Sequence, residues 1–82
     1  MKVISFNLDY EVIEFNYFIT EIEDKPITVL ELLINCKIDD FYEEDFNSIF
    51  VFKTADLTYV FSGFKVEEFY EEGQYLHVTC VK

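Results

Sequence analysis

The stretch DFYEEDFNSIF, residues 40–50, decides the fold class of this chain, because it is the one segment with a helical pattern. Its apolar side chains recur at a spacing that stacks them on one face of a helix with 3.6 residues per turn. They are Tyr42, Phe46, Ile49 and Phe50. Asp40 is a suitable N-cap residue, and Glu43 follows it at the spacing of a capping box. The stretch therefore predicts one short helix over residues 40–50.

An internal repeat offers a second interpretation of the same stretch. Residues 37–44 read KIDDFYEE, and residues 65–72 read KVEEFYEE. Gly73 ends the second copy in a pattern typical of a hairpin turn. If the first copy turns in the same way at Asn47-Ser48, the chain is all-β.

The remainder of the chain has the pattern of β-strands, because β-branched and aromatic residues are abundant and Ala55 is the single alanine. Apolar and polar residues alternate with a period of two, which indicates half-buried strands. The phase of this alternation changes near residues 9–12, where we expect a turn or a bulge. Residues 23–26, Glu-Asp-Lys-Pro, predict a second turn. The expected strands cover residues 2–10, 13–20, 30–38, 50–54, 57–62, 64–71 and 74–81.

The elements together predict the order β-β-β-α-β-β-β-β in a single compact domain over residues 1–82. The predicted fold class is α+β and β-rich, with the helix packed on an antiparallel sheet or on a small barrel. The all-β fold is the alternative, and it depends on residues 40–50 alone.

The charge of the chain limits the partners that it can bind. Six lysines, no arginine and 17 acidic residues give a formal net charge of −11. Such a chain repels DNA, RNA and anionic lipid, so we expect neither direct nucleic-acid binding nor membrane binding. An acidic surface suits a basic protein instead. The alternative is that the acidity only keeps an aromatic-rich chain soluble.

The two cysteines, Cys36 and Cys80, are too few for a disulfide scaffold and lie in apolar alternating segments. We expect both to be reduced, and a bridge between them requires that their strands are neighbours. No apolar run is long enough to span a membrane, and no signal-peptide pattern is present. These features predict a cytoplasmic protein. The use of lysine without arginine, together with abundant Ile, Phe, Tyr and Asn, is typical of AT-rich codons, which indicates a low-GC bacterial host or one of its phages.

Catalytic patterns are absent from the sequence. His77 is the only histidine, and Cys80, three residues later on the same expected strand, points to the opposite face. No serine lies in a Gly-x-Ser-x-Gly elbow, and the chain has no arginine to clamp a phosphate or a carboxylate. We therefore predict that the protein is not an enzyme and has no catalytic residues.

The sequence also predicts no metal and no cofactor. The densest acidic run, residues 39–45, lacks the spacing and the glycine of a calcium loop. Zinc would need more cysteines and histidines than the chain contains.

The informative feature is that acidic residues cluster around aromatic ones. Five carboxylates fall within residues 39–45 and four within residues 67–72, and a Phe-Tyr pair lies in each run. Clustered charges repel one another, and a solubility role would be served better by spreading them. Tyrosine adds an anchor of the kind that protein interfaces favour. The predicted partner-binding residues are Asp39, Asp40, Glu43, Glu44, Asp45, Glu67, Glu68, Tyr70, Glu71 and Glu72. The alternative is a solvated face.

These features predict a non-catalytic module that binds a basic protein, such as a nucleic-acid-binding enzyme. In size and charge the chain resembles the small acidic inhibitors, DNA mimics among them, that phages and mobile elements direct at host nucleic-acid enzymes. The alternative is a phage tail, virion or other assembly domain that acts through apolar subunit contacts. In several expected strands both faces are apolar, so some aromatic side chains should lie exposed or in a homodimer interface.

Overall fold

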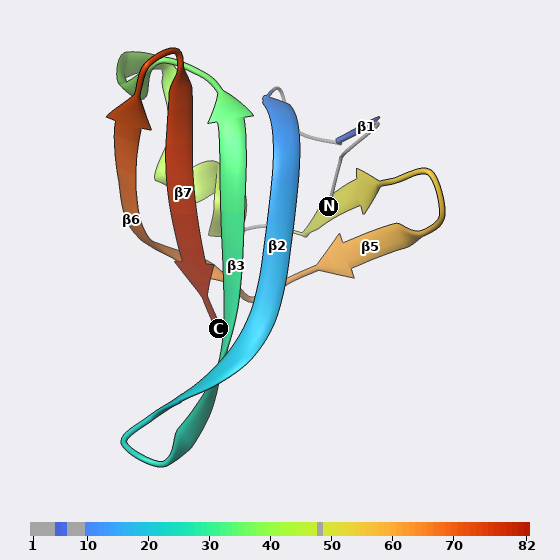
Figure 1. Ribbon diagram of the computed structural model, residues 1–82, viewed down its shortest axis with the longest axis vertical. Coiled ribbons are helices and arrows are strands. Elements are labelled where there is room, and N and C mark those ends of the chain that lie inside the picture. Colours follow the sequence, from blue (N-terminus) through green and yellow to red (C-terminus); the bar gives the residue numbers. More distant parts are fainter. Residues whose placement is uncertain (1–4, 7–9, 48) are drawn as a thin grey trace.

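A computed structural model describes the chain over residues 5–6, 10–47 and 49–82 (Figure 1). Strands dominate it, and two short 3-10 helices stand between the third and fourth strands. The strands are β1 (Ser5–Phe6), β2 (Glu11–Ile22), β3 (Lys25–Asn35), β4 (Phe50–Lys53), β5 (Thr58–Phe61), β6 (Lys65–Glu72) and β7 (Tyr75–Val81). The 3-10 helices are η1 (Ile38–Asp40) and η2 (Glu43–Asn47).

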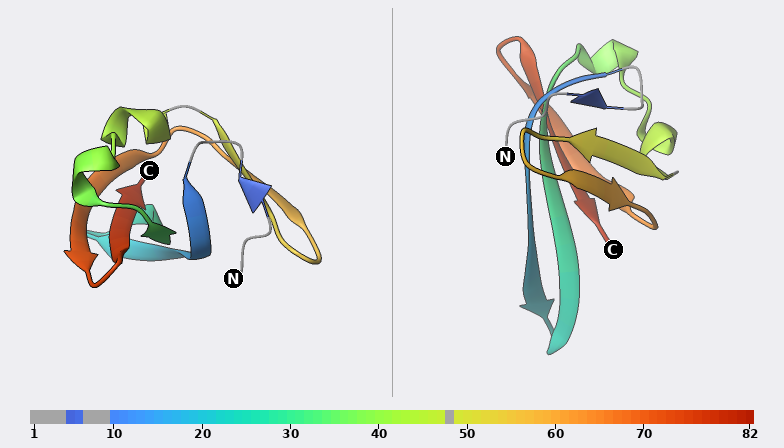
Figure 2. Two further views of the ribbon diagram at one scale, coloured as in Figure 1. Left: turned by 90° about the horizontal axis from the view of Figure 1, so that it is seen from above. Right: turned by 90° about the vertical axis from the view of Figure 1, so that its right-hand side faces the viewer.

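The strands form two antiparallel sheets. The larger has the order β2-β3-β7-β6, and the smaller has the order β1-β4-β5. The smaller sheet and the two 3-10 helices lie on the same face of the larger sheet (Figure 2). The described residues leave the opposite face of the larger sheet uncovered.

The predicted α-helix over residues 40–50 is wrong, and the all-β alternative fits the structure. The helical stripe would have buried Tyr42 and Ile49, but both side chains are 60% exposed. Phe46 and Phe50 of the predicted stripe are buried, and Phe41, which lies outside the stripe, is buried with them. Five residues of an α-helix turn the chain by about 140° beyond one full turn, so one α-helix cannot direct the rings of Phe41 and Phe46 at the same core. Two separate 3-10 helices in place of one α-helix allow both rings to point into the core.

The turn predicted over residues 23–26 is present but shorter, because Lys25 and Pro26 already belong to β3. β2 and β3 are joined by a two-residue loop in which Glu23 (φ 52°) and Asp24 (φ 64°) both adopt positive φ. This is the arrangement of a type I′ turn. Gly73 (φ 64°) opens the two-residue loop between β6 and β7, as expected. Residues 54–57 connect β4 to β5, where Thr54 Oγ1 accepts a hydrogen bond from the Leu57 amide at 3.1 Å.

The N-terminal expectations are tested only in part. Of the strand expected over residues 2–10, the structure describes Ser5–Phe6 as β1 and Tyr10 in a bend, and the other residues lie outside the described part. The bulge expected near residues 9–12 occurs slightly later, where the register of β2 against β3 shifts between Val12 and Glu14. The turn at Asn47-Ser48 involves Ser48, which also lies outside the described residues.

The core is built from aromatic rings of the smaller sheet and η2, packed on alternate residues of the larger sheet. Phe15 of β2 and Phe52 of β4 lie 4.7 Å apart between ring centroids, and Phe46 lies 5.6 Å from Phe50. The fully buried side chains are Phe15, Phe46, Phe50, Phe52, Leu30, Ile34, Leu76, Val78 and Cys80. No described helix is long and apolar enough to cross a membrane.

The hairpin of β2 and β3 extends well beyond the rest of the larger sheet (Figures 1 and 2). The β3 strand pairs with β7 only between Val29 and Ile34, whereas β2 and β3 remain paired up to Ile22 and Lys25. We call residues 19–27 the arm. Its two strands have only each other as described strand partners.

Candidate functional site

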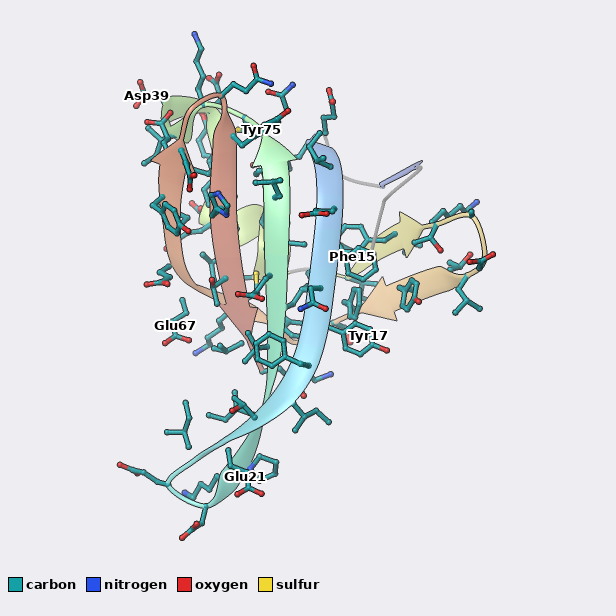
Figure 3. The ribbon with its side chains drawn as sticks, viewed as in Figure 1. Phe15, Tyr17, Glu21, Asp39, Glu67 and Tyr75 are labelled. Atoms are coloured by element: carbon teal, nitrogen blue, oxygen red, sulfur yellow. The ribbon has the colours of Figure 1, made fainter. Side chains whose placement is uncertain are left out.

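The predicted acidic residues lie on three elements that meet along the β6 side of the larger sheet. Asp39 and Asp40 lie in η1, Glu43, Glu44 and Asp45 in η2, and the four glutamates in β6. η2 packs against β6. Figure 3 shows Asp39 and Glu67 on this side of the molecule, away from Glu21 in the arm. We call these residues, together with Tyr70, the acidic surface.

The β6 glutamates do not share one face, which the sequence run conceals. Successive side chains of a strand alternate between faces. Glu68, Tyr70 and Glu72 stand opposite Thr79, His77 and Tyr75 on the uncovered face, whereas Glu71 stands opposite the buried Leu76. Glu67 is the extra residue of a bulge between Val66 and Glu68. The acidic surface therefore wraps around the β6 edge.

Tyr70 and Glu72 both contact His77. The Tyr70 and His77 rings stack with 4.7 Å between centroids, and His77 Nε2 lies 3.3 Å from Glu72 Oε2. The contact between His77 and Glu72 is an ion pair only when the imidazole is protonated. Among the described residues, no lysine lies within ion-pair distance of the carboxylates in η1 and β6, or of Glu43 and Glu44 in η2. Asp45 makes further contacts.

Asp45 has a structural contact that the sequence did not reveal. The Tyr10 hydroxyl donates a hydrogen bond to Asp45 Oδ2 at 2.7 Å, and its oxygen accepts one from the Tyr42 amide at 3.0 Å. Partial burial and the bond to Asp45 raise the pKa of Tyr10 to about 12. Asp45 thus ties η2 to Tyr10, the residue that precedes β2.

Tyr42 is exposed beside the acidic surface, although its spacing in the sequence predicted a place in a buried helical stripe. Its side chain is 60% exposed and stands between η1 and η2, whereas Tyr70 is 50% exposed. The residue type could have distinguished the exposed Tyr42 from its buried neighbour Phe41. Phe41 is purely apolar and buried, while tyrosine carries a hydroxyl that favours the edge of an interface.

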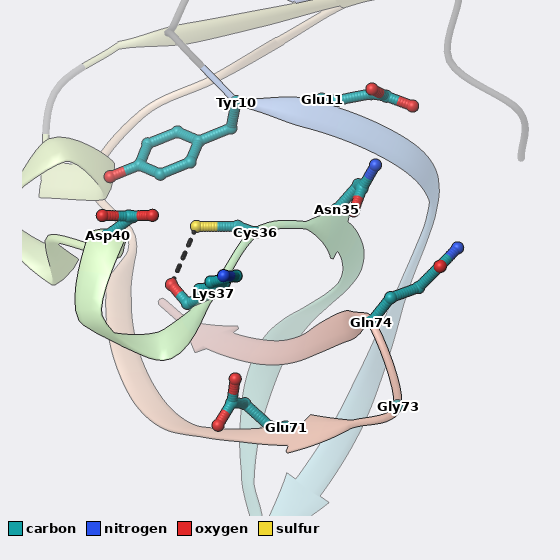
Figure 4. Close-up of a pocket in the computed structure, with 9 residues that line it drawn as sticks. All are labelled: Tyr10, Glu11, Asn35, Cys36, Lys37, Asp40, Glu71, Gly73 and Gln74. Atoms are coloured by element: carbon teal, nitrogen blue, oxygen red, sulfur yellow. Dashed lines mark hydrogen bonds between the residues drawn. The ribbon is translucent and has the colours of Figure 1, made fainter.

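A pocket opens where η1 meets the end of β6 (Figure 4). It has a volume of about 570 Å³ and is lined by Tyr10, Glu11, Asn35, Cys36, Lys37, Asp40, Glu71, Gly73 and Gln74. The Ile38 amide donates to Glu71 Oε2 at 3.3 Å, which holds η1 against β6. Asp40 and Glu71 thus face one cavity from different elements.

The thiol in this pocket is held in its neutral form. Both cysteines are free, and Cys36 Sγ donates to the Lys37 carbonyl oxygen at 3.2 Å. Burial first, and then the charges of Asp40 and Glu71, raise the pKa of Cys36. Burial alone raises the pKa of Cys80 to about 12. Because the thiolate is the reactive form, neither side chain is poised as a nucleophile.

The substitution Glu71→Gln is expected to speed alkylation of Cys36 by iodoacetamide at pH 8. Removing a nearby negative charge stabilises the thiolate and lowers the pKa of Cys36, so the reactive fraction rises severalfold. The rate is followed by mass spectrometry of the intact chain. Glu68→Gln is the control, because this side chain stands on the other face of β6. Equal rates in both variants would show that Glu71 does not act on the thiol.

Comparison with known proteins adds no relative. No protein-family model matches the chain, and no curated protein or solved structure matches it either.

Proposed function

We propose that this protein is a non-catalytic binding module whose acidic surface engages a basic protein. The observation that supports the proposal is that carboxylates from η1, η2 and β6 gather on one side with little compensating charge. Lys37 lines the pocket that contains Asp40 and Glu71, and Lys65 lines a second hollow with Glu43 and Glu44. A basic partner would relieve the repulsion among these carboxylates on binding.

The partner that fits this surface best is a nucleic-acid-binding protein. Such proteins carry basic grooves that track phosphates. Glu68 and Glu72, on the same face of β6, are four residues and therefore about 13 Å apart, which is about four base-pair rises along DNA. Carboxylates on β6 and on the adjacent 3-10 turns can occupy part of such a groove. The proposed action is therefore inhibition of a host nucleic-acid enzyme by competition with its substrate.

The proposal is tested by capture from bacterial lysate at low and high salt, followed by binding kinetics with the captured protein. Wild-type affinity should fall steeply with salt, and duplex DNA should compete with the chain. The double variant Asp39→Lys, Glu43→Lys should bind about tenfold or more weakly, mainly through a slower association rate.

The matched control is Glu21→Lys, Asp56→Lys, which changes the net charge equally at exposed positions in the arm and in the β4–β5 loop. This variant should retain most of the affinity, since neither residue belongs to the acidic surface. Equal losses in both variants would mean that only the net charge matters, and the acidic surface would be a solvated face.

A second candidate function is that of a phage tail, virion or other assembly domain. The specific observation in its favour is exposed apolar area on the arm and on the β4–β5 hairpin, where Ile19 is 71% exposed and Val60 is 65% exposed. Salt distinguishes the two functions. Contacts between apolar surfaces survive or strengthen in high salt, whereas contacts of the acidic surface weaken.

A further inference from the structure

The uncovered face of the larger sheet, which faces the viewer in Figure 3, is less polar than a solvated face. An antiparallel sheet with one face in water is expected to place polar residues on that face. β7 instead places Tyr75 and Val81 there, and β3 places Leu33 there, all three half-buried. The stacked rings of Tyr70 and His77 continue this apolar strip onto β6. Apolar area rimmed by polar residues is typical of a protein contact surface.

Carboxylates stand on both sides of the apolar strip. Glu31 of β3 and Glu68 of β6 both stand opposite Thr79 of β7. They therefore lie in one row across three strands, with their Cα atoms about 9.6 Å apart. Neither carboxylate forms an ion pair with a described residue. Lys65 stands opposite Val81, near the end of β7, so the acidic part of the face is the part around Thr79.

A hollow of about 290 Å³ opens on the same face, over β2, β3 and β7. Glu14 and Glu31 line it together with Leu33 and His77. The hollow thus combines two carboxylates with apolar walls. Such a lining suits a lysine or arginine side chain, whose aliphatic stem packs on apolar surface while its charged end meets carboxylates.

We propose that this face binds a basic amphipathic α-helix of the nucleic-acid-binding partner, and that the helix lies along β7. The inference rests on the proposed function and names the element that the partner presents. An α-helix with its side chains is about 10–12 Å wide, so a helix over β7 has Glu31 beneath one flank and Glu68 beneath the other. β7 is about 20 Å long between its first and last Cα atoms, which matches about 14 residues of a helix.

Charge selects a basic helix over the other occupants of such a face. A second copy of this chain carries a net charge of −11 and would bring further carboxylates to the face. A purely apolar helix would cover Glu31 and Glu68 without pairing them, which costs free energy. Helices that enter the major groove of DNA carry the basic residues that contact phosphates. Binding of such a helix here removes it from DNA, in keeping with the proposed competition.

A synthetic peptide tests the proposal without the natural partner. The probe has about 14 residues, with leucine on one face of a helix and lysine on the other. The control peptide has the same composition in an order that leaves no face apolar. The isotope-labelled full chain is titrated with each peptide and followed by nuclear magnetic resonance. The helical peptide should shift the amide signals of β3, β6 and β7, and the control peptide should bind about tenfold more weakly.

Glu31→Lys is the decisive variant, because Glu31 lies on this face and outside the acidic surface. It should weaken binding of the helical peptide about tenfold or more. The matched control is Glu21→Lys, which changes the net charge equally at an exposed position on the opposite face of the same sheet. This control should weaken binding by less than about twofold. Circular dichroism checks that both variants fold.

Several results would overturn the proposal. They are no binding of the helical peptide, equal binding of both peptides, equal weakening by the two variants, or shifts confined to η1 and η2. Signals that shift with protein concentration in the free chain would place a second copy on this face, and contacts from the face to another segment of the chain would show that it is already covered. The proposed function is decided separately by the captured partner and the variant Asp39→Lys, Glu43→Lys, so its failure is distinguishable.

Discussion

Replacing Phe46 with alanine is expected to lower the free energy of unfolding by roughly 3–5 kcal/mol. The ring is fully buried and lies 5.4 Å from Tyr10, 5.6 Å from Phe41 and 5.6 Å from Phe50 between centroids. Truncation removes these contacts and leaves a cavity beneath η2. Because small domains are stable by only about 5–15 kcal/mol, the variant should unfold at far lower urea concentrations, as measured by circular dichroism.

The matched control is Tyr42→Ala, in the turn that leads into η2. Its side chain is exposed, so truncation should change the free energy of unfolding by only about 0.5 kcal/mol. If the two variants lose equal stability, residues 41–47 do not pack as described. If Tyr42→Ala keeps its stability but binds the basic partner more weakly, Tyr42 belongs to the binding surface.

Replacing the turn Glu23-Asp24 with Asn-Gly is expected to raise the free energy of unfolding by about 1–2 kcal/mol and Tm by roughly 5–10 °C. Both native residues adopt positive φ, where a side chain costs energy that asparagine bears more easily and glycine avoids. The turn links the two strands of the arm. The strained residues therefore lie where β2 and β3 pair only with each other among the described strands. Differential scanning calorimetry measures the change.

Gly73→Ala provides the opposite test at the β6–β7 hairpin. Gly73 has φ 64°, and a Cβ placed there would meet no atom within 4 Å, so the cost of the substitution is purely conformational. We expect a loss of about 1 kcal/mol. An unchanged Tm for the Asn-Gly variant, with a lower Tm for Gly73→Ala, would show that Glu23 and Asp24 are not strained.

Local features of the chain were predictable because neighbouring residues decide them. Alternation with a period of two identified β2, β3, β6 and β7, and Gly73 identified a hairpin turn. The free state of Cys36 and Cys80 also agrees with the expectation, even though they belong to segments that lie next to each other. Cys80 stands opposite Leu30, far along the strand from position 36, so neighbouring strands alone do not allow a bridge.

The acidic surface was predictable as a set of charged runs but not as a shape. The sequence places four glutamates close together, yet the strand sends Glu71 to one face and Glu72 to the other. The hydrogen bond from Tyr10 to Asp45 joins residues that are far apart in the chain, so no local sequence pattern predicts it. The position of β2 at one end of the larger sheet likewise follows from strand pairing, because β3 is its only partner among the described strands.

The internal repeat shows most clearly what the sequence determined and what the tertiary structure decided. Residues 37–44 and 65–72 share one pattern of charge and aromatics, and that pattern fixes which residues avoid the core: the acids remain exposed in both copies. The pattern does not select the backbone conformation. The second copy lies beside β7, whose amides and carbonyls complete its ladder, and becomes β6. The first copy has no such neighbour among the described strands, so its amides bond partly within 3-10 turns and partly to the side chains of Glu71 and Tyr10. It buries Phe41 against Phe69 of the second copy, 4.8 Å away between ring centroids.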